Sequence, residues 1–292
     1  MFAIERYKKA QSVEDAVKLL AADPGSRLIA GGTDVLIRLH GGSKEYRSLV
    51  DINGLTELKT ISETTDGTVR IGSMATFSEI MDSNIINRCV PVIAEAVGTV
   101  GGPQLRNMAT IGGNICNGAV SADSAGALLV LEADLEIRGV NGERRVPVIG
   151  FHQGPGRVAL GQGDLLVAFH IRPENYKGFG AAYYKYAMRD AMDIATIGCT
   201  AAACLDGDKI EQLRLAFTVA APKPIRCEHA EKAAAGKPFS KKTLEAISDQ
   251  VEKDVNPRDS WRATKAFRLH VIHTLTKRVV RQAIVRAGGT FK

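Results

Sequence analysis

The chain has 292 residues, of which 45% are hydrophobic and 24% are charged, a composition typical of a globular protein with a buried core. Its length suggests two domains. No apolar run reaches the roughly 18 residues of a transmembrane helix, and the first twenty residues lack the pattern of a signal peptide. We therefore expect a cytoplasmic protein without membrane contact.

Cysteine spacing and charge exclude several kinds of site. The five cysteines form no Cys-x-x-Cys pair, which excludes an obvious zinc or iron–sulfur motif, and we expect them to be buried structural thiols. The net charge is +6, but no acidic residue follows Asp259 and the rest of the chain is slightly acidic. The terminal segment is thus predicted to be an amphipathic helix with a solvated basic face. Docking of an acidic partner is the alternative, and no nucleic-acid partner is expected.

The first 55 residues are predicted to form a small β-α-β unit. Ser12, followed by Glu14 and Asp15, is typical of a helix start. Two short strands then flank a short helix. Their predicted bounds are strands 27–30 and 48–52 and helix 35–39.

A second unit begins at the alternating strand 68–72. It should contain helices 76–81, 90–97 and 122–131, strands 135–137 and 165–171, and an irregular glycine-rich stretch at 98–118. A polar joint at 172–180 then leads to strands 183–186, 197–205 and 212–220, followed by helices at 228–235, 241–253 and 260–287. Strands followed by helices are typical of the α+β class.

Two glycine-rich turns are the strongest candidates for a binding site. Residues 28–35 read Leu-Ile-Ala-Gly-Gly-Thr-Asp-Val, and residues 109–114 read Ala-Thr-Ile-Gly-Gly-Asn. Adjacent glycines let backbone N–H groups approach a ligand and form anion-binding nests. Neither turn matches the dinucleotide fingerprint or the P-loop. Together they suggest a diphosphate site with two arms, whereas each alone also fits a structural turn.

These two turns, at this spacing, resemble the FAD-binding subunits of molybdenum hydroxylases, the family of xanthine dehydrogenases and carbon monoxide dehydrogenases. The resemblance covers nearly the whole chain, and residues 110–124 and 185–194 are most similar to the separate FAD subunit of bacterial xanthine dehydrogenases. It implies an α+β fold with a two-part FAD-binding domain of the vanillyl-alcohol-oxidase (PCMH) type. That domain would cover residues 1–176, with subdomains of about 1–55 and 56–176, and a smaller α+β domain with an antiparallel sheet would cover 177–292.

The resemblance also implies which residues bind FAD. The first loop would wrap the pyrophosphate, and the second would lie against the phosphates and near the flavin. These residues are Arg27, Leu28, Ile29, Ala30, Gly31, Gly32, Thr33 and Asp34, and Ala109, Thr110, Ile111, Gly112, Gly113 and Asn114.

Four further residues match family positions outside the two loops. Asp123 would contact the adenosine half, Leu165 and Leu166 would meet the cofactor through their backbone, and Lys185 would lie near the flavin ring. The alternatives are that Asp123 caps the following helix, that Lys185 is a surface lysine and that the leucines are core residues. Arg189, Asp190 and Asp193 would modulate the flavin or NAD⁺ access, or else be solvated loop charges.

The implied activity is electron transfer within a complex. FAD would be bound non-covalently, since no histidine lies in either glycine loop. It would take electrons from 2Fe-2S clusters on a small partner subunit and pass a hydride to NAD⁺. A large partner subunit with the molybdenum cofactor would oxidise hypoxanthine or xanthine to urate. This chain then needs no metal and no catalytic acid–base pair of its own. Nicotinate, another purine, an aldehyde or carbon monoxide are alternative substrates, and a self-contained flavin oxidase is a further alternative.

Overall fold

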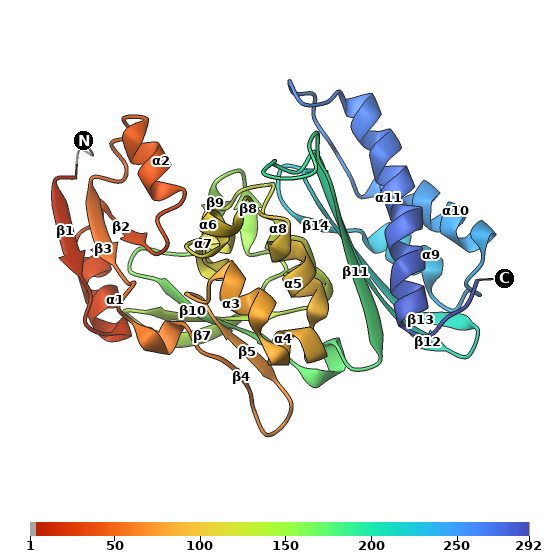
Figure 1. Cartoon of the computed structure of the whole chain (residues 1–292), viewed down its shortest axis with the longest axis horizontal. Helices are drawn as coiled ribbons and strands as arrows, with labels where there is room; N and C mark the ends of the chain where they lie inside the picture. Colours follow the sequence, from red (N-terminus) through yellow and green to blue (C-terminus); the bar gives the residue numbers. More distant parts are fainter. Residues whose placement is uncertain (1–3, 292) are drawn as a thin grey trace.

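Three sheets follow one another along the long axis of the molecule in the computed structural model, which describes residues 4–291 (Figure 1). The first is parallel, and the other two, of five and four strands, are antiparallel. Helices cover the second and third sheets, so the predicted α+β class is confirmed. No helix within residues 4–291 has the length and apolar character needed to cross a membrane.

The first sheet has the strand order β1-β3-β2 and contains the predicted β-α-β unit. Helix α1 begins after Ser12, whose hydroxyl accepts a hydrogen bond from the Asp15 N–H. Strand β1 escaped prediction because its four residues are all exposed and show no apolar alternation. The bounds are β1 (Arg6–Lys9), α1 (Val13–Ala22), β2 (Ser26–Ile29), α2 (Val35–His40) and β3 (Ser48–Asp51).

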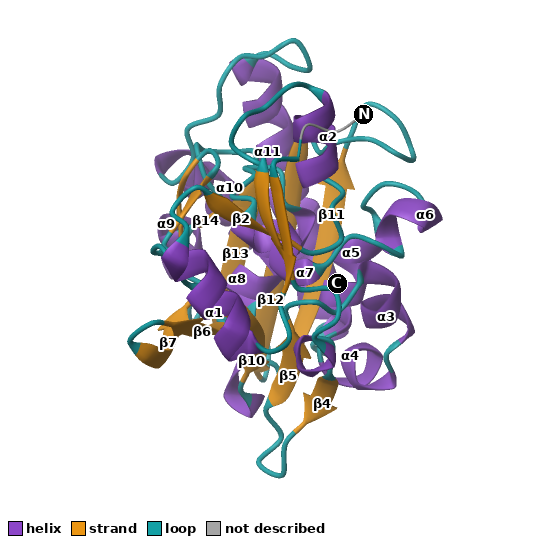
Figure 2. Cartoon of the chain, turned by 90° about the vertical axis from the view of Figure 1, so that its left-hand side faces the viewer, coloured by secondary structure: helices purple, strands orange, loops and turns teal. Residues whose placement is uncertain are grey.

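The second sheet has the order β4-β5-β10-β6-β7, and these strands lie side by side in Figure 2. Its central strand β10 is buried on both faces, between the first unit and the helices α3 to α8. The strands are β4 (Ile61–Glu63), β5 (Val69–Gly72), β6 (Asp134–Gly139), β7 (Gly142–Pro147) and β10 (Leu165–Ile171), and β8 (His152–Gly154) and β9 (Arg157–Val158) form a separate hairpin.

The expectation of an irregular stretch at 98–118 is wrong, because two short helices lie within it. Pro103 occupies the first turn of α6, and the Thr110 hydroxyl accepts a hydrogen bond from Gly113 N–H at the start of α7. Capping thus starts a helix here despite the low helix propensity of glycine. The helices over this sheet are α3 (Phe77–Asp82), α4 (Asn84–Cys89), α5 (Pro91–Gly98), α6 (Pro103–Arg106), α7 (Ile111–Cys116) and α8 (Asp123–Val130).

The third sheet has the order β11-β12-β13-β14, with three helices on its outer side (Figure 1). Its side chains alternate between two cores: Ala201 and Ala203 face the outer helices, while Ala202 joins the core around α8. The elements are β11 (Phe179–Tyr186), β12 (Ile197–Asp206), β13 (Lys209–Thr218), β14 (Ile225–Arg226), α9 (Glu228–Ala234), α10 (Lys241–Gln250) and α11 (Lys265–Arg286). The predicted order of strands and helices is therefore confirmed.

Helix α11 has the expected buried apolar face, and Lys277, Arg278 and Arg281 are exposed opposite it. It begins later than predicted, because Thr264 is its cap and Ser260 still pairs with Ala263 as an isolated bridge.

The third sheet shares its inner core with the helices of the second. The boundary between two domains at residues 176/177 stays our prediction. All five cysteines are free, and Cys199 and Cys227 are buried.

Candidate cofactor-binding site

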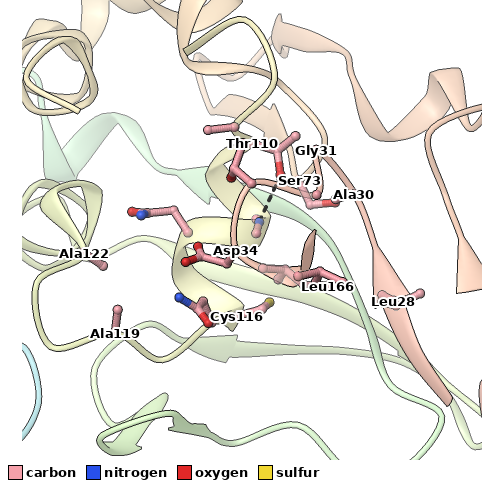
Figure 3. Close-up of a pocket in the computed structure, with 18 of the residues that line it drawn as sticks. Leu28, Ala30, Gly31, Asp34, Ser73, Thr110, Cys116, Ala119, Ala122 and Leu166 are labelled. Atoms are coloured by element: carbon pink, nitrogen blue, oxygen red, sulfur yellow. Dashed lines mark hydrogen bonds between the residues drawn. The ribbon is translucent and has the colours of Figure 1, made fainter. Parts of the chain in front are cut away.

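A cavity of about 960 Å³ lies where the three sheets meet, and Figure 3 shows part of its lining. Most of its walls come from the β2–α2 turn, residues 100–123, residues 156–166, and the end of β11 with the loop that follows it, and residues 73–77 are among the segments that add further lining. Cavities of this volume are typical of sites for large organic ligands. The cavity is therefore the candidate functional site.

All but three of the residues that the sequence assigned to FAD binding line this one cavity. Ile111 and Leu165 have no exposed surface and point into the core, and Ile29 likewise lies outside the lining. The lining residues are Arg27, Leu28, Ala30, Gly31, Gly32, Thr33, Asp34, Ala109, Thr110, Gly112, Gly113, Asn114, Asp123, Leu166 and Lys185.

The first glycine turn, residues 31–34, presents a row of free backbone donors. Within residues 4–291, nothing accepts a hydrogen bond from the N–H groups of these four residues. A Cβ on Gly31 would lie 1.7 Å from the carbonyl oxygen of Met108, and Gly32 has φ +73°. Only glycine therefore fits at position 31, and the turn packs directly on the residues that precede the second turn. Successive unpaired N–H groups of this kind bind anions.

The second glycine turn differs from expectation, because its N–H groups are already used. Ile111 N–H donates to Ala75 O (3.1 Å), Gly112 N–H to Ser73 O (2.8 Å) and Gly113 N–H to Thr110 Oγ1 (3.1 Å). The turn is the first turn of α7, so it is no open nest. What it can offer a ligand are the Thr110 hydroxyl hydrogen and the Asn114 side-chain NH₂, since both residues line the cavity and Asn114 Oδ1 already accepts from the Ser124 hydroxyl (2.6 Å).

Asp123 and Lys185 meet at one end of the cavity. Lys185 Nζ donates to Asp123 Oδ2 (3.0 Å) and to Thr99 O (3.1 Å), and the Tyr183 hydroxyl donates to Asp123 Oδ1 (2.6 Å). Burial raises the pKa of Asp123, and the neighbouring Lys185 ammonium opposes this shift. Because a 3.0 Å ion pair joins the two side chains, both face the same part of any ligand.

Both alternatives for these two residues are wrong. Ala122 occupies the N-cap position of α8, and Asp123 makes no capping hydrogen bond. The Lys185 side chain is 8% exposed, so it is no surface lysine. Asp193 also lines the cavity, whereas Arg189 and Asp190 do not. The Asp193 carboxylate accepts backbone hydrogen bonds from Met188, Arg189 and Ile194 and so shapes the loop after β11.

Ser73 is a lining residue that sequence reasoning missed. It is buried, and its hydroxyl oxygen has no hydrogen-bond partner within the described part of the chain. A buried hydroxyl without a partner is costly, and its place in the lining makes this one available to a ligand. No sequence signal marks it, since it lies between strand β5 and α3 as one more small residue. Figure 3 shows it beside Gly31 and Thr110.

Comparisons with known proteins agree with this geometry. A family profile described as the FAD binding domain in molybdopterin dehydrogenase matches residues 2–173, and one for the CO dehydrogenase flavoprotein C-terminal domain matches residues 182–283. The xanthine dehydrogenase FAD-binding subunit of Escherichia coli O157:H7 is 52% identical over 289 residues, which cover 99% of each chain. The carbon monoxide dehydrogenase medium chain of Hydrogenophaga pseudoflava is 31% identical and covers 97% of this chain and 98% of its own.

The fold is found in solved structures as well. A chain of carbon monoxide dehydrogenase from Hydrogenophaga pseudoflava superposes with a TM-score of 0.93 at 30% identity, covering 98% of this chain and 99% of that one. A chain of quinoline 2-oxidoreductase from Pseudomonas putida 86 shares the fold, with a TM-score of 0.92 at 24% identity, covering 98% and 99%. The resemblance seen in the two glycine turns is thereby confirmed, and this chain belongs to the family of FAD-binding subunits of molybdenum hydroxylases.

Proposed function

We propose that this chain is the FAD-binding electron-transfer subunit of a molybdenum-containing xanthine dehydrogenase. The observation that carries the FAD role is the row of unpaired N–H groups at residues 31–34 inside a cavity of about 960 Å³. The purine assignment is supported by the 52% identity to a subunit named for xanthine dehydrogenase. The glyceraldehyde dehydrogenase and carbon monoxide dehydrogenase medium chains are only 30% and 31% identical.

The residues present fit FAD. The N–H groups of residues 31–34 would hold the pyrophosphate, and the missing side chain of Gly31 leaves room for close approach. We place the flavin ring toward Lys185. Since Lys185 pairs with Asp123, this puts Asp123 beside the ring as well, instead of against the adenosine half. Leu166 lines the same cavity.

The binding is non-covalent in this proposal. No histidine is among the described residues that line the cavity. Cys116 is the cysteine in the lining, and burial raises the pKa of its thiol to about 12. A thiol with such a pKa stays protonated at neutral pH and is a poor nucleophile. The wall therefore supports a cofactor held by hydrogen bonds and packing.

When bound, FAD would supply redox chemistry, taking electrons that arrive from 2Fe-2S clusters on a small partner subunit and passing a hydride to NAD⁺. The chain's own residues bind and orient the cofactor and exclude water from the cavity. The Lys185 ammonium stabilises negative charge near the ring. Oxidation of hypoxanthine or xanthine to urate would take place on a large partner subunit that carries the molybdenum cofactor, which explains why no catalytic acid–base pair is needed here.

A visible absorption spectrum of the complex, purified with its co-expressed partners, tests this proposal. The flavin absorbance should bleach on addition of hypoxanthine or xanthine and recover on addition of NAD⁺. Bleaching by NADH, nicotinate, an aldehyde or carbon monoxide, and not by a purine, would contradict the purine substrate. A complex without flavin would contradict the FAD role. Rapid oxygen consumption with substrate by this chain alone would favour a self-contained flavin oxidase.

A further inference from the structure

Three buried polar side chains form a continuous hydrogen-bonded line at the cavity wall. Tyr183 and Lys185 are two residues apart on β11 and therefore point to the same face of the sheet. Asp123, the first residue of α8, lies between them and accepts one hydrogen bond on each carboxylate oxygen, at 2.6 Å from Tyr183 and 3.0 Å from Lys185. Tyr183 and Asp123 are 8% and 4% exposed.

The three residues are placed differently relative to the cavity. Asp123 and Lys185 line it, whereas Tyr183 does not. The Tyr183 ring belongs to the core shared by the second and third sheets, so its hydroxyl is held in a fixed place. The Tyr183 hydroxyl donates its hydrogen bond to Asp123 Oδ1. The other carboxylate oxygen, Oδ2, is then directed at the Lys185 ammonium.

Lys185 needs such support if it is to act on a ligand. A lysine side chain has four rotatable bonds and a point charge that can move. Here two of its three N–H bonds are fixed, by Asp123 and by the backbone oxygen of Thr99, and one is left over. A buried carboxylate is tolerated only where it is paired and hydrogen-bonded. The same contacts thus balance the negative charge of the Asp123 carboxylate and hold the Lys185 ammonium at the cavity wall.

We infer that Tyr183 is a positioning residue, which acts through Asp123 to hold the Lys185 ammonium against the flavin. This inference rests on the proposed FAD site. It also predicts how charge at the site sets the flavin potential. Asp123→Asn removes the negative charge beside Lys185, so reduction of the flavin becomes easier and its midpoint potential rises. Lys185→Met has the opposite effect and lowers that potential.

The test uses the full chain and a matched pair of tyrosine variants. Tyr183→Phe removes the hydroxyl that binds Asp123. Tyr184→Phe removes a hydroxyl from the next residue of the strand, on the opposite face, and keeps the ring on which Arg278 lies at 4.3 Å. The dissociation constant for FAD is measured by quenching of flavin fluorescence, the midpoint potential by redox titration, and folding by thermal unfolding.

Tyr183→Phe should weaken FAD binding by about five- to tenfold, as loss of an ordinary hydrogen bond does, and Tyr184→Phe should leave it unchanged. Because Tyr183 acts through Lys185, the double variant Tyr183→Phe/Lys185→Met should bind FAD no more weakly than Lys185→Met alone. Its midpoint potential should likewise equal that of Lys185→Met.

Other results would overturn the inference. Equal FAD affinity in the two tyrosine variants would exclude a role for the Tyr183 hydroxyl. If the fold-changes in the FAD dissociation constant of the two single variants multiply in the double variant, Tyr183 acts independently of Lys185. A fall in potential on Asp123→Asn, a variant that keeps the side-chain shape, would contradict the charge argument even if Tyr183→Phe folded poorly. A folded wild-type chain that takes up no FAD would instead refute the proposed function.

Discussion

At the scale of single residues, the cavity is defined by atoms that are absent or unpaired. Gly31 lacks the Cβ that would collide with Met108 O, and residues 31–34 have N–H groups without acceptors inside the described chain. Ser73 adds a hydroxyl without a partner there. Polar groups left unpaired in the wall of a cavity are available to a ligand.

Gly31→Ala should weaken FAD binding by more than about tenfold and lower the free energy of unfolding by about 1–3 kcal/mol, since the added methyl group overlaps a backbone oxygen. Flavin fluorescence and thermal unfolding measure the two effects. Gly41→Ala is the control, because its Cβ would find only ordinary contacts at 3.5 Å. Equal FAD affinity in both variants would show that the first turn does not hold the cofactor.

Ser73→Ala should move affinity and stability in opposite directions. Removing a buried hydroxyl without a protein partner leaves the free chain as stable or more stable. If that hydroxyl binds FAD, the dissociation constant should rise by about three- to tenfold. Calorimetry of the free chain and a fluorescence titration with FAD separate the two effects. A loss of stability with unchanged affinity would place the Ser73 hydroxyl in the fold and not in the site.

His152 should make the protein sensitive to mild acid. Burial lowers its pKa from 6.5 to about 4, and its Nε2 has no partner in the described structure. Between these two values the unfolded chain binds a proton that the folded chain does not. The contribution of His152 to stability is thus complete above pH 6.5 and declines as the pH falls toward 4. The unfolding temperature of His152→Gln should fall less over this range than that of the wild type, and parallel curves would refute the assignment.

At the scale of elements, one close contact ties the second unit to the third sheet. Helix α8 crosses β12 at Gly126, where a Cβ would lie 2.5 Å from Thr200 Oγ1. Asp123 is on this same helix, so the contact also sets where the Asp123 carboxylate meets Lys185 on β11. The position of the cavity end therefore depends on how closely α8 approaches the sheet.

Gly126→Ala should lower the free energy of unfolding by about 1–3 kcal/mol through overpacking. Thr200→Ala removes the atom that the new methyl group meets, so the double variant should regain most of the loss. Denaturant unfolding of the four proteins in this cycle measures the coupling. If the double variant is no more stable than the sum of the single changes predicts, the contact at Gly126 does not limit the packing.

Apolar runs and periodicity predicted the elements whose side chains enter a core. The β10 strand, which is buried along its whole length, and the order of strands and helices after residue 180 are examples. It failed for β1, whose exposed residues carry no pattern, and for α6 and α7, where Pro103 and the Thr110 cap outweigh the glycines. The free N–H groups at 31–34 agree with the nest expected there, but those of the second turn are consumed by Ser73, Ala75 and Thr110. Hydrogen-bond partners that are distant along the chain cannot be predicted from the spacing of motifs in one sequence.

At the scale of the whole molecule, the site exists only because distant segments meet. Gly31, Thr110, Leu166 and Lys185 are spread over more than half of the chain and line one cavity. Composition and motifs suggested a diphosphate site, and the family resemblance linked these positions. Ser73 and Tyr183, which no motif marks, became visible only in the folded structure. FAD bound here would contact residues of all three sheets and should stabilise them together.

The most direct test of this account is the visible spectrum of the purified full-length chain after incubation with FAD and removal of the excess, followed by acid precipitation. We predict a yellow protein with bound flavin absorbance, and release of all of that flavin into the supernatant as intact FAD. A folded chain that stays colourless would contradict the proposed cofactor. Flavin that remains with the precipitate would contradict a cofactor held only by hydrogen bonds and packing.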